Sequence, residues 1–532
     1  MIQRIELVLT PAQAQEDNYL HQQILQELHL EEAGRLKAVL PIRRSIDARS
    51  KTPVVRLLVE AYVDEEYTPP APIVQSYGQV EQAPKVIVVG AGPAGYFAAL
   101  KLIELGLKPI VYDRGKTVRD RRRDLRAIQQ EGVVNGDSNY CFGEGGAGTY
   151  SDGKLYTRSK KRGKIENILR LLVEHGATSD ILVDAHPHIG SNKLPKVVAQ
   201  MRETILAHGG EIHFDSKVTD LIIETKKDHS RQIKGVVING EQETFASAVI
   251  LATGHSARDI YTLLYHKNIR LEAKPFALGV RIEHPQPLID QIQYRQKNRD
   301  PHLPAASYSL VSQIQKRGVF SFCMCPGGLI VPAATAPEEL VVNGMSLSRR
   351  DSPYSNSGLV VAIELEDLTA YNKKEFEGIQ DPIFNGLKFQ QEVEQTMFQA
   401  GDGSQKAPAQ RIVDFTRGKI SNSLPSTSYI PGVYAAPMQE LLPKWVAERL
   451  QKALPEFNKK KKGYFTNEAQ IVGTESRTSS PLRIPRDPAH LMHPDVVGLY
   501  PCGEGAGFAG GIVSAAMDGE KVAKTIADWL AL

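Results

Sequence analysis

The spacing of hydrophobic positions in the first 63 residues predicts a small unit of strand, helix, strand and strand. Apolar side chains recur at every second position over 4–9 and 54–63, which is the period of a half-buried strand. Between these strands, one face of a helix that starts at Asp17 carries Leu20, Ile24 and Leu28, and a further strand is expected at 36–41. We expect an N-terminal β-α-β-β domain over 1–63 and a proline-rich linker over 64–84.

From residue 85 the pattern becomes that of an α/β protein. Residues 86–89 are all apolar, as in a parallel strand buried on both faces, and strands then alternate with helices up to residue 255. A short apolar strand at 496–500 and a helix over 511–530 return to this pattern at the end of the chain. The fold class we predict is α/β, with a discontinuous Rossmann-like domain over 85–255 and 496–532.

The segment 256–495 has a different pattern, in which extended stretches predominate. It predicts a mainly antiparallel α+β domain, which is the best candidate for a substrate domain. The extended stretches are 319–323, 328–332, 340–345 and 360–364, and helices are expected near 383–400 and 441–453.

The first parallel strand runs into a glycine-rich turn, Gly90-Ala91-Gly92-Pro93-Ala94-Gly95, and then into a helix over 96–106. In such a dinucleotide-binding fingerprint Gly90 permits the tight turn, Gly92 lets the backbone approach a pyrophosphate, and Gly95 brings the helix close to the strand. A second strand, 109–112, ends in Asp113, whose carboxylate would accept hydrogen bonds from ribose hydroxyls. The fingerprint predicts a nucleotide with an ADP half, which is common to NAD and FAD.

A second acid follows a strand near the end of the chain, in the motif Gly503-Glu504. Its carboxylate could bond ribitol or ribose hydroxyls. The last helix begins near Gly511 and Ile512, and its N-terminus could face the N1/C2 edge of a flavin and stabilise the negative charge of the reduced ring. These features favour FAD over NAD.

The fingerprint, the strand end Ala252-Thr253-Gly254 and the terminal Gly503-Glu504 motif resemble the FAD-dependent oxidoreductase superfamily related to glutathione reductase and p-hydroxybenzoate hydroxylase. Within it, the chain is similar to a group of mostly uncharacterised bacterial and plastid FAD-dependent dehydrogenases, distantly similar to geranylgeranyl reductases. The similarity covers nearly the whole chain, including 44–49, 141–155 and 477–481. Superfamily members commonly carry Glu at the place of Asp113 and Asp at the place of Glu504. The resemblance implies that the strand around Val218 offers main-chain groups to the adenine edge.

A second glycine-rich stretch, 143–153, has no apolar strand before it, so it does not predict a second dinucleotide fold for NAD(P)H. We expect its backbone N–H groups to wrap the FAD pyrophosphate or the flavin, and a flexible surface loop is the alternative. With Arg114, which follows Asp113, the further residues expected at the cofactor are Gly145, Gly146, Thr149, Ser151, Asp152 and Lys154.

Few side chains are candidates for catalysis, since hydride chemistry belongs to a flavin. His188 could donate to a substrate or make a structural hydrogen bond. Arg477 could orient a substrate anion, touch the flavin, or form an internal salt bridge. Cys323 and Cys325 on an extended strand would have Cα atoms about 6.7 Å apart, near the limit for a disulfide, so Cys325 is taken as a neighbour of substrate or as a buried small residue. No metal site is expected from the His186-Pro187-His188 motif.

Composition and charge narrow the class. A chain of 532 residues with 42% hydrophobic and 23% charged residues is typical of a globular protein of about three domains. A net charge of +3 gives no general attraction to nucleic acid, and acidic and basic residues balance in the N-terminal unit, so nucleic-acid binding is not expected. Four cysteines make no disulfide framework, and no membrane span or secretory signal is seen, so we expect a cytoplasmic protein. The arginine-rich segment 119–126 and the lysine run 459–462 are interpreted as a solvated helix face and a polar loop.

The function expected from these residues is that of an FAD-dependent oxidoreductase, a dehydrogenase or reductase. It would transfer hydride between an unknown small molecule and non-covalently bound FAD, and NAD(P)H could act as a transient donor in the substrate cleft. Alternatives are a flavin-dependent monooxygenase, and a non-catalytic flavin-binding sensor or RNA-associated scaffold.

Overall fold

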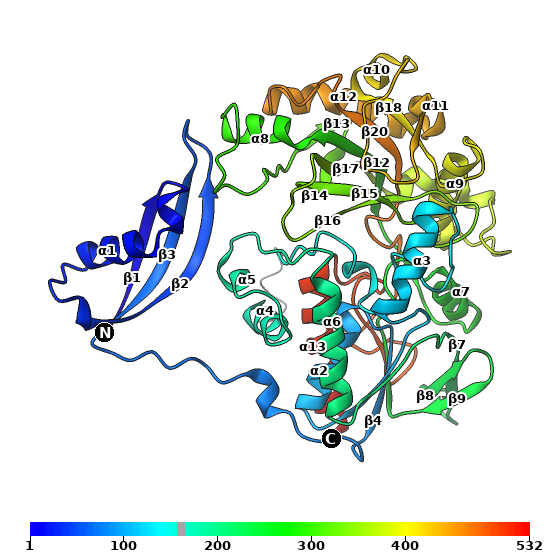
Figure 1. Cartoon of the computed structure of the whole chain (residues 1–532). Helices are drawn as coiled ribbons and strands as arrows, with labels where there is room; N and C mark the ends of the chain where they lie inside the picture. Colours follow the sequence, from blue (N-terminus) through cyan, green and yellow to red (C-terminus); the bar gives the residue numbers. More distant parts are fainter. Residues whose placement is uncertain (157–164, 532) are drawn as a thin grey trace.

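The computed structural model describes residues 1–156 and 165–531. The N-terminal unit is an antiparallel sheet in the order β1-β3-β2, covered on one face by α1, and it stands apart from the main body (Figure 1). Alternate residues of β3 are buried, which matches the period-2 pattern of its sequence. The bounds are β1 Ile2–Leu9, α1 Asp17–Glu27, β2 Leu36–Asp47 and β3 Val54–Val63.

The edge strand β2 connects this unit to the main body. Arg44 forms ion pairs with Asp184, at 2.7 Å, and with Asp180 of helix α5 (Asp180–Val183), at 3.0 Å. The backbone takes part as well, since the amide N–H of Ala185 donates to the carbonyl oxygen of Arg44 at 2.9 Å. Residues 180–185 therefore carry a contact between the N-terminal unit and the rest of the chain.

A five-stranded parallel sheet, β22-β10-β4-β5-β6, forms the lower part of the main body. The last strand of the chain thus joins strands from its first half. Along β4, Val86 and Val88 face helices α2, α6 and α13, whereas Ile87 and Val89 face the sheet β7-β8-β9. Both faces are buried, which explains the continuous apolar run. The strands are β4 Lys85–Val89, β5 Lys108–Tyr112, β6 Glu211–His213, β7 Val218–Thr225, β8 Arg231–Ile238, β9 Gln242–Phe245, β10 Ala248–Leu251 and β22 Leu499–Pro501; the helices are α2 Pro93–Glu104, α3 Val118–Gln130, α4 Ile165–Glu174, α6 Leu194–Ala207 and α13 Ile512–Leu530.

The upper part of the main body is a seven-stranded sheet, β13-β14-β17-β12-β20-β18-β19, in which only β18 and β19 run parallel. Helices α9 and α12 pack against it, and a two-stranded sheet, β15-β16, lies beside it. The strands are β12 Phe276–Pro285, β13 Val311–Ile314, β14 Arg317–Cys325, β15 Gly328–Pro332, β16 Val342–Ser346, β17 Tyr354–Ile363, β18 Ala407–Arg411, β19 Val433–Ala435 and β20 Gln470–Glu475; the helices are α8 Gln286–Tyr294, α9 Asn385–Gln399, α10 Ile412–Arg417, α11 Met438–Leu441 and α12 Lys444–Lys460.

The segment 256–495 does not pack as one body. Helix α7 (Arg258–His266) and the short strand β21 (Leu482–Arg483), which pairs with β11 (Glu272–Ala273), share a hydrophobic core with the parallel sheet. Only the residues between them build the seven-stranded sheet. The lysine run also differs from expectation, because Lys459 and Lys460 form the end of α12 rather than a loop. Among the described residues, no helix has the length and apolarity that crossing a membrane requires.

Candidate functional site

Glycine-rich segments from distant parts of the chain meet at the carboxyl ends of the parallel strands. A Cβ atom added to Gly146 would lie 3.1 Å from the Cα of Gly92, and one added to Gly503 would lie 2.9 Å from the Cβ of Ala94. A Cβ on Gly505 would be 2.3 Å from the carbonyl oxygen of Gly254, and one on Gly148 would be 3.0 Å from Cγ1 of Ile512. At Gly146 and Gly505 backbone meets backbone, and at Gly503 and Gly148 backbone meets a side chain, so a larger residue would be crowded at each position.

Asp113 holds the fingerprint turn. Its buried carboxylate accepts hydrogen bonds from the amides of Ala91 and Gly115, both at 2.8 Å. The tight approach of strand and helix is equally clear at Gly95, where a Cβ would lie 1.9 Å from the carbonyl oxygen of Gly90. Asp113 therefore stands beside the fingerprint as expected and helps to shape it.

A small cavity opens beside Asp113. Arg114 lies over the ring of Phe142 at 4.6 Å and forms an ion pair with Asp259. The hydroxyl oxygen of Thr253 is buried without a hydrogen-bond partner among the described residues. An orphaned buried hydroxyl costs free energy unless a ligand or water satisfies it, so Thr253 is a candidate hydrogen-bonding partner for a ligand in this cavity. The lining residues are Val89, Gly90, Tyr112, Asp113, Arg114, Phe142, Ser216, Val218, Thr253, Ala257 and Ile260.

The loop 143–153 begins against the fingerprint. Gly145 and Gly146 have φ values of +77° and +60°, in the left-handed region that favours glycine, and the amide of Gly145 donates to the carbonyl oxygen of Ala91 at 2.8 Å. Two hydroxyls expected at the cofactor bond within the loop instead. Thr149 donates to the carbonyl oxygen of Glu144 at 3.1 Å, and Ser151 donates to that of Gly148 at 2.7 Å.

Arg121 is a residue that the sequence interpretation missed. It is fully buried, so the expectation of a solvated face is wrong at this position. Its guanidinium donates to three backbone carbonyl oxygens of the adjacent loop. The helical spacing of Val118, Arg121, Leu125 and Ile128, all buried in α3, is the signal that could have identified it.

The end of the same loop turns toward the seven-stranded sheet. Asp152 is buried and forms ion pairs with Arg350, whose Nε lies 3.1 Å away, and Lys154 donates to the carbonyl oxygen of Met324. Burial alone would raise the pKa of Asp152, but Lys154 and Arg350 outweigh it and lower that pKa. The structure thus places Asp152 and Lys154 at the junction of the loop with β14 and β16, away from the fingerprint.

His188 lies at this junction too. It forms an antiparallel bridge with Lys154, and its Nε2 is 3.2 Å from the carbonyl oxygen of Ser348. Burial lowers the pKa of His188. Of the two roles proposed for His188, the structure supports the structural hydrogen bond, because it provides a partner for it.

The cysteines of β14 do not lie on regular extended strand. The pairing of β14 with β17 shifts between Phe322 and Cys325, and Cys323 has a φ of +42°. Arg281 fixes this bulge by donating to the carbonyl oxygen of Cys323 at 2.6 Å while forming an ion pair with Glu475 at 2.7 Å. The disulfide argument assumed a regular extended strand, and this assumption is wrong for Cys323 and Cys325. Both thiols are free.

Only one of these two thiols is accessible. Cys325 is buried and donates to the carbonyl oxygen of Cys323 at 3.3 Å, whereas the Cys323 side chain is exposed. Desolvation nevertheless raises the pKa of Cys323 to about 11, with Lys154 and Arg281 acting in the opposite direction. Cys323 is the more exposed of the two cysteines, so it is the better candidate for contact with a substrate.

Arg477 takes part in a buried cluster of four charges. Its Nη2 lies 2.9 Å from Glu339 and from Glu394, and Arg258 of α7 pairs with the same two carboxylates at 2.6 and 2.7 Å. Burial would raise the pKa of Glu394, but Arg477 and Arg258 hold it well below its usual range. The internal salt bridge is the interpretation of Arg477 that these contacts support.

Glu504 lies at the loop before α13. Burial raises its pKa to about 7, and Lys274 opposes this shift. The following helix begins at Ile512, after Gly511, so the expected acid and helix N-terminus occur on one segment.

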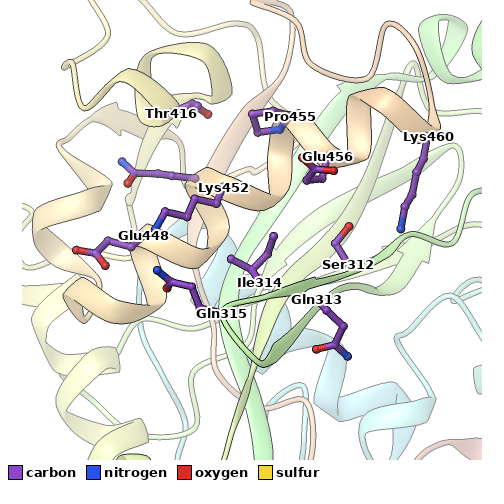
Figure 2. Close-up of a pocket in the computed structure, with 11 residues that line it drawn as sticks. Ser312, Gln313, Ile314, Gln315, Thr416, Glu448, Lys452, Pro455, Glu456 and Lys460 are labelled. Carbon is purple, nitrogen blue, oxygen red and sulfur yellow. The ribbon is translucent and has the colours of Figure 1, made fainter.

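Other features offer no rival site. A hollow of about 1110 Å³ on α12 and β13 is open and lined by long polar side chains, among them Glu448, Lys452 and Glu456 (Figure 2). It lies at the opposite end of the main body from the fingerprint helix α2 (Figure 1). Within the described part of the chain, no three His, Cys, Asp or Glu side chains gather as metal ligands would.

Solved structures with a similar arrangement have low sequence identity to this chain. They include CtdE in complex with FAD, with 11% identity, 84% of each chain covered and a TM-score of 0.32. A geranylgeranyl bacteriochlorophyll reductase-like protein from Thermoplasma acidophilum has 13% identity and a TM-score of 0.33, and covers 84% of this chain and 79% of its own. The tetracycline destructase Tet(51) has 11% identity, 84% and 82% coverage, and a TM-score of 0.32.

Sequence comparison gives the stronger relationships. Residues 1–62 match a domain of unknown function, and residues 275–478 match the family described as FAD-dependent protein, C-terminal domain-like. An uncharacterised protein of Clostridium beijerinckii is 42% identical over 530 residues, which is 96% of each chain. The chain therefore belongs to the same family as this Clostridium protein, and its residues 275–478 are similar to the FAD-dependent protein, C-terminal domain-like family.

Proposed function

We propose that this protein is an FAD-dependent oxidoreductase that transfers hydride between a small-molecule substrate and non-covalently bound FAD, which is reduced by a substrate or by NAD(P)H. The observation that carries the proposal is the meeting of glycine-rich segments, from Gly90 to Gly511, at the carboxyl ends of the parallel strands. Ligands of open α/β sheets bind at this edge. The assignment to FAD also rests on the family match of residues 275–478.

The residues present fit this cofactor. Asp113 and the Thr253 hydroxyl would hold the adenosine half, Gly92 and Gly146 would border the diphosphate, and Glu504 would lie toward the ribityl chain. When bound, FAD supplies the hydride acceptor or donor. The chain itself would bind and orient the two halves of the ligand.

The surroundings of the exposed Cys323 are the proposed substrate side. At neutral pH the Cys323 sulfur keeps its proton, because burial raises its pKa to about 11. The ammonium of Lys154 is held nearby by the Met324 carbonyl oxygen, and the Asp152–Arg350 pair fixes the loop that carries it. These groups would orient a polar substrate and keep a proton available at the sulfur.

The direct test is an absorption spectrum of the purified protein, followed by anaerobic titration with NADH and NADPH. We expect a flavin spectrum that bleaches with one of the two donors or with a substrate. A colourless protein that cannot be reconstituted with FAD would contradict the proposal. Oxygen incorporated into product would indicate a monooxygenase, and retained FAD without turnover by any donor would indicate a sensor or scaffold.

A substitution at Gly92 tests whether the bound flavin occupies the proposed site. A Cβ at Gly92 would meet only the Cα of Gly146, at 3.8 Å, so Gly92→Val should fold yet obstruct the approach of a diphosphate. We expect a loss of bound flavin with little change in melting temperature. Gly78→Ala, at a position with no atom within 4 Å of the added Cβ, is the matched control. Wild-type flavin content in Gly92→Val would refute the assigned contact.

A further inference from the structure

Two arginine side chains, Arg121 and Arg281, are completely buried in this protein. Buried charges in proteins are normally paired. Arg281 is paired with Glu475, whose carboxylate lies 2.7 Å away. Arg121 forms no hydrogen bond or ion pair with a carboxylate anywhere in 1–156 or 165–531, which makes it the exception that needs a physical explanation.

Two of the three hydrogen bonds of Arg121 go to the glycine-rich loop, and the third goes to Asn139 just before it. The guanidinium donates to the carbonyl oxygens of Asn139, Glu144 and Gly146, at 2.7, 2.8 and 2.9 Å. Gly143 packs directly on the side chain, since a Cβ there would lie 2.8 Å from Cδ of Arg121. Arg121 therefore helps to hold the conformation of the loop, through its backbone carbonyl groups.

The acids nearby are already occupied. The Glu144 carboxylate accepts from Val118 N and Tyr96 Oη and forms an ion pair with Arg202 at 3.0 Å. Asp113 acts on Arg121 only at longer range, because its oxygens accept from two backbone amides. Burial accordingly lowers the pKa of Arg121, whereas Glu475 and other groups outweigh burial and raise that of Arg281.

The direction of the loop peptides shows where a partner would lie. In a trans peptide the C=O and the following N–H point in opposite directions. The carbonyls of Glu144 and Gly146 point to Arg121, so the N–H groups of Gly145 and Ala147 point to the other side. That side is the fingerprint, as the bond from Gly145 N to the Ala91 carbonyl oxygen shows.

The loop thus lies between the buried cation and Gly92, where a diphosphate would approach. The N–H of Gly145 already donates to Ala91, so a diphosphate there would receive the N–H of Ala147, on a peptide whose carbonyl oxygen accepts from Arg121. It would compensate the guanidinium charge across one layer of backbone. We infer that Arg121 is a positioning residue for the diphosphate of the bound dinucleotide, acting through the peptides of residues 144–147. This inference rests on the proposed FAD site.

The experiment compares ligands with and without the diphosphate on the full chain after removal of flavin. FAD, ADP, adenosine and riboflavin are titrated by calorimetry into the wild type, Arg121→Met and Arg121→Lys. We expect Arg121→Met to weaken FAD and ADP binding by about 10- to 100-fold, as loss of a charge-assisted contact does, and adenosine and riboflavin binding by much less. Arg121→Lys keeps the charge and should fall between. Arg123→Met, an exposed change in the same helix, should behave as wild type.

The outcomes separate the inference from the proposed function. Equal weakening of all four ligands by Arg121→Met would indicate a purely structural role, and wild-type binding of ADP by the variant would indicate no role at all; both overturn the inference. If Arg121→Met does not fold, the preference of Arg121→Lys for ADP over adenosine decides the question. A wild-type protein that binds no FAD would instead contradict the proposed function.

Discussion

Cys323 shows how the conformation of a single residue depends on contacts from three parts of the chain. Its left-handed backbone is held by Arg281 of β12 and by Cys325, both donating to its carbonyl oxygen, while Lys154 of the glycine-rich loop donates to the next carbonyl. Non-glycine residues in this region of φ are strained, and such strain persists where the surroundings fix it. Cys323 is also the exposed cysteine of the pair and lies on the proposed substrate side.

The raised pKa of Cys323 has a measurable consequence for its reactivity. Only about one thiol in a thousand is ionised at pH 8 when the pKa is about 11. We therefore expect slow alkylation by iodoacetamide at neutral pH, with a rate that rises about tenfold for each pH unit up to pH 11. Peptide mapping by mass spectrometry measures this rate, and Cys323→Ser is the control. Rapid labelling of Cys323 at pH 7 would contradict the assignment.

At the scale of elements, the best-predicted segments are those with the most regular apolar pattern, and the half-buried strand β3 has the expected bounds, 54–63. Strands β4 and β5 and helix α13 lie within a residue of their expected bounds, because a continuous apolar run or a long periodic helix has little alternative. Helix α12 instead runs on through Pro455 to Lys460, since Leu454 and Phe457 remain buried and their packing outweighs the hydrogen bond that the proline removes. This burial depends on the residues packed against α12, so the sequence of the helix alone does not predict where it ends.

The contact of α2 with α13 gives a prediction for element packing. A Cβ at Gly519 of α13 would lie 2.1 Å from the carbonyl oxygen of Ala94, next to the fingerprint. Gly519→Val should separate the two helices, lower the free energy of unfolding by about 1–3 kcal/mol or more, and reduce flavin retention. Urea unfolding and the flavin absorbance check both effects. Gly34→Ala, where the added Cβ meets nothing within 4 Å, should leave both unchanged.

At the scale of the whole molecule, charged groups join segments that are distant in the sequence. Arg44 ties the N-terminal unit to residues 180–185, Asp152 ties the glycine-rich loop to Arg350, and Arg258 ties α7 to Glu339 and Glu394. These contacts, with the shared core below α7, orient the parallel sheet against the seven-stranded sheet.

The stability of the whole molecule should depend on pH through buried histidines. Burial lowers the pKa of His284 to about 4, while the unfolded chain has a histidine pKa of about 6.5. Between these two pKa values, His284 is protonated in the unfolded state but neutral in the folded state. The contribution of His284 is therefore complete above pH 6.5 and is lost toward pH 4, by about 1.4 kcal/mol per pH unit.

Urea unfolding of His284→Gln at pH 7 and pH 5 tests this linkage. The variant should lose less stability than the wild type over this interval. His21→Gln, at an exposed position, should follow the wild type. The same loss in His284→Gln and wild type would show that His284 is not kept neutral.

The sequence by itself determined the fingerprint, the strand-terminal acids and the periodic elements, because glycine sterics and hydrophobic periodicity act within a few residues along the chain. It also predicted FAD through the combination of the Gly90 and Gly503 motifs. The tertiary structure decided which distant polar groups meet: Asp152 with Arg350, Arg477 with Glu339 and Glu394, and Arg121 with the loop behind the proposed diphosphate. Whether a charge is buried, and what compensates it, depends on the packing of the whole chain, so periodicity and spacing alone did not reveal it.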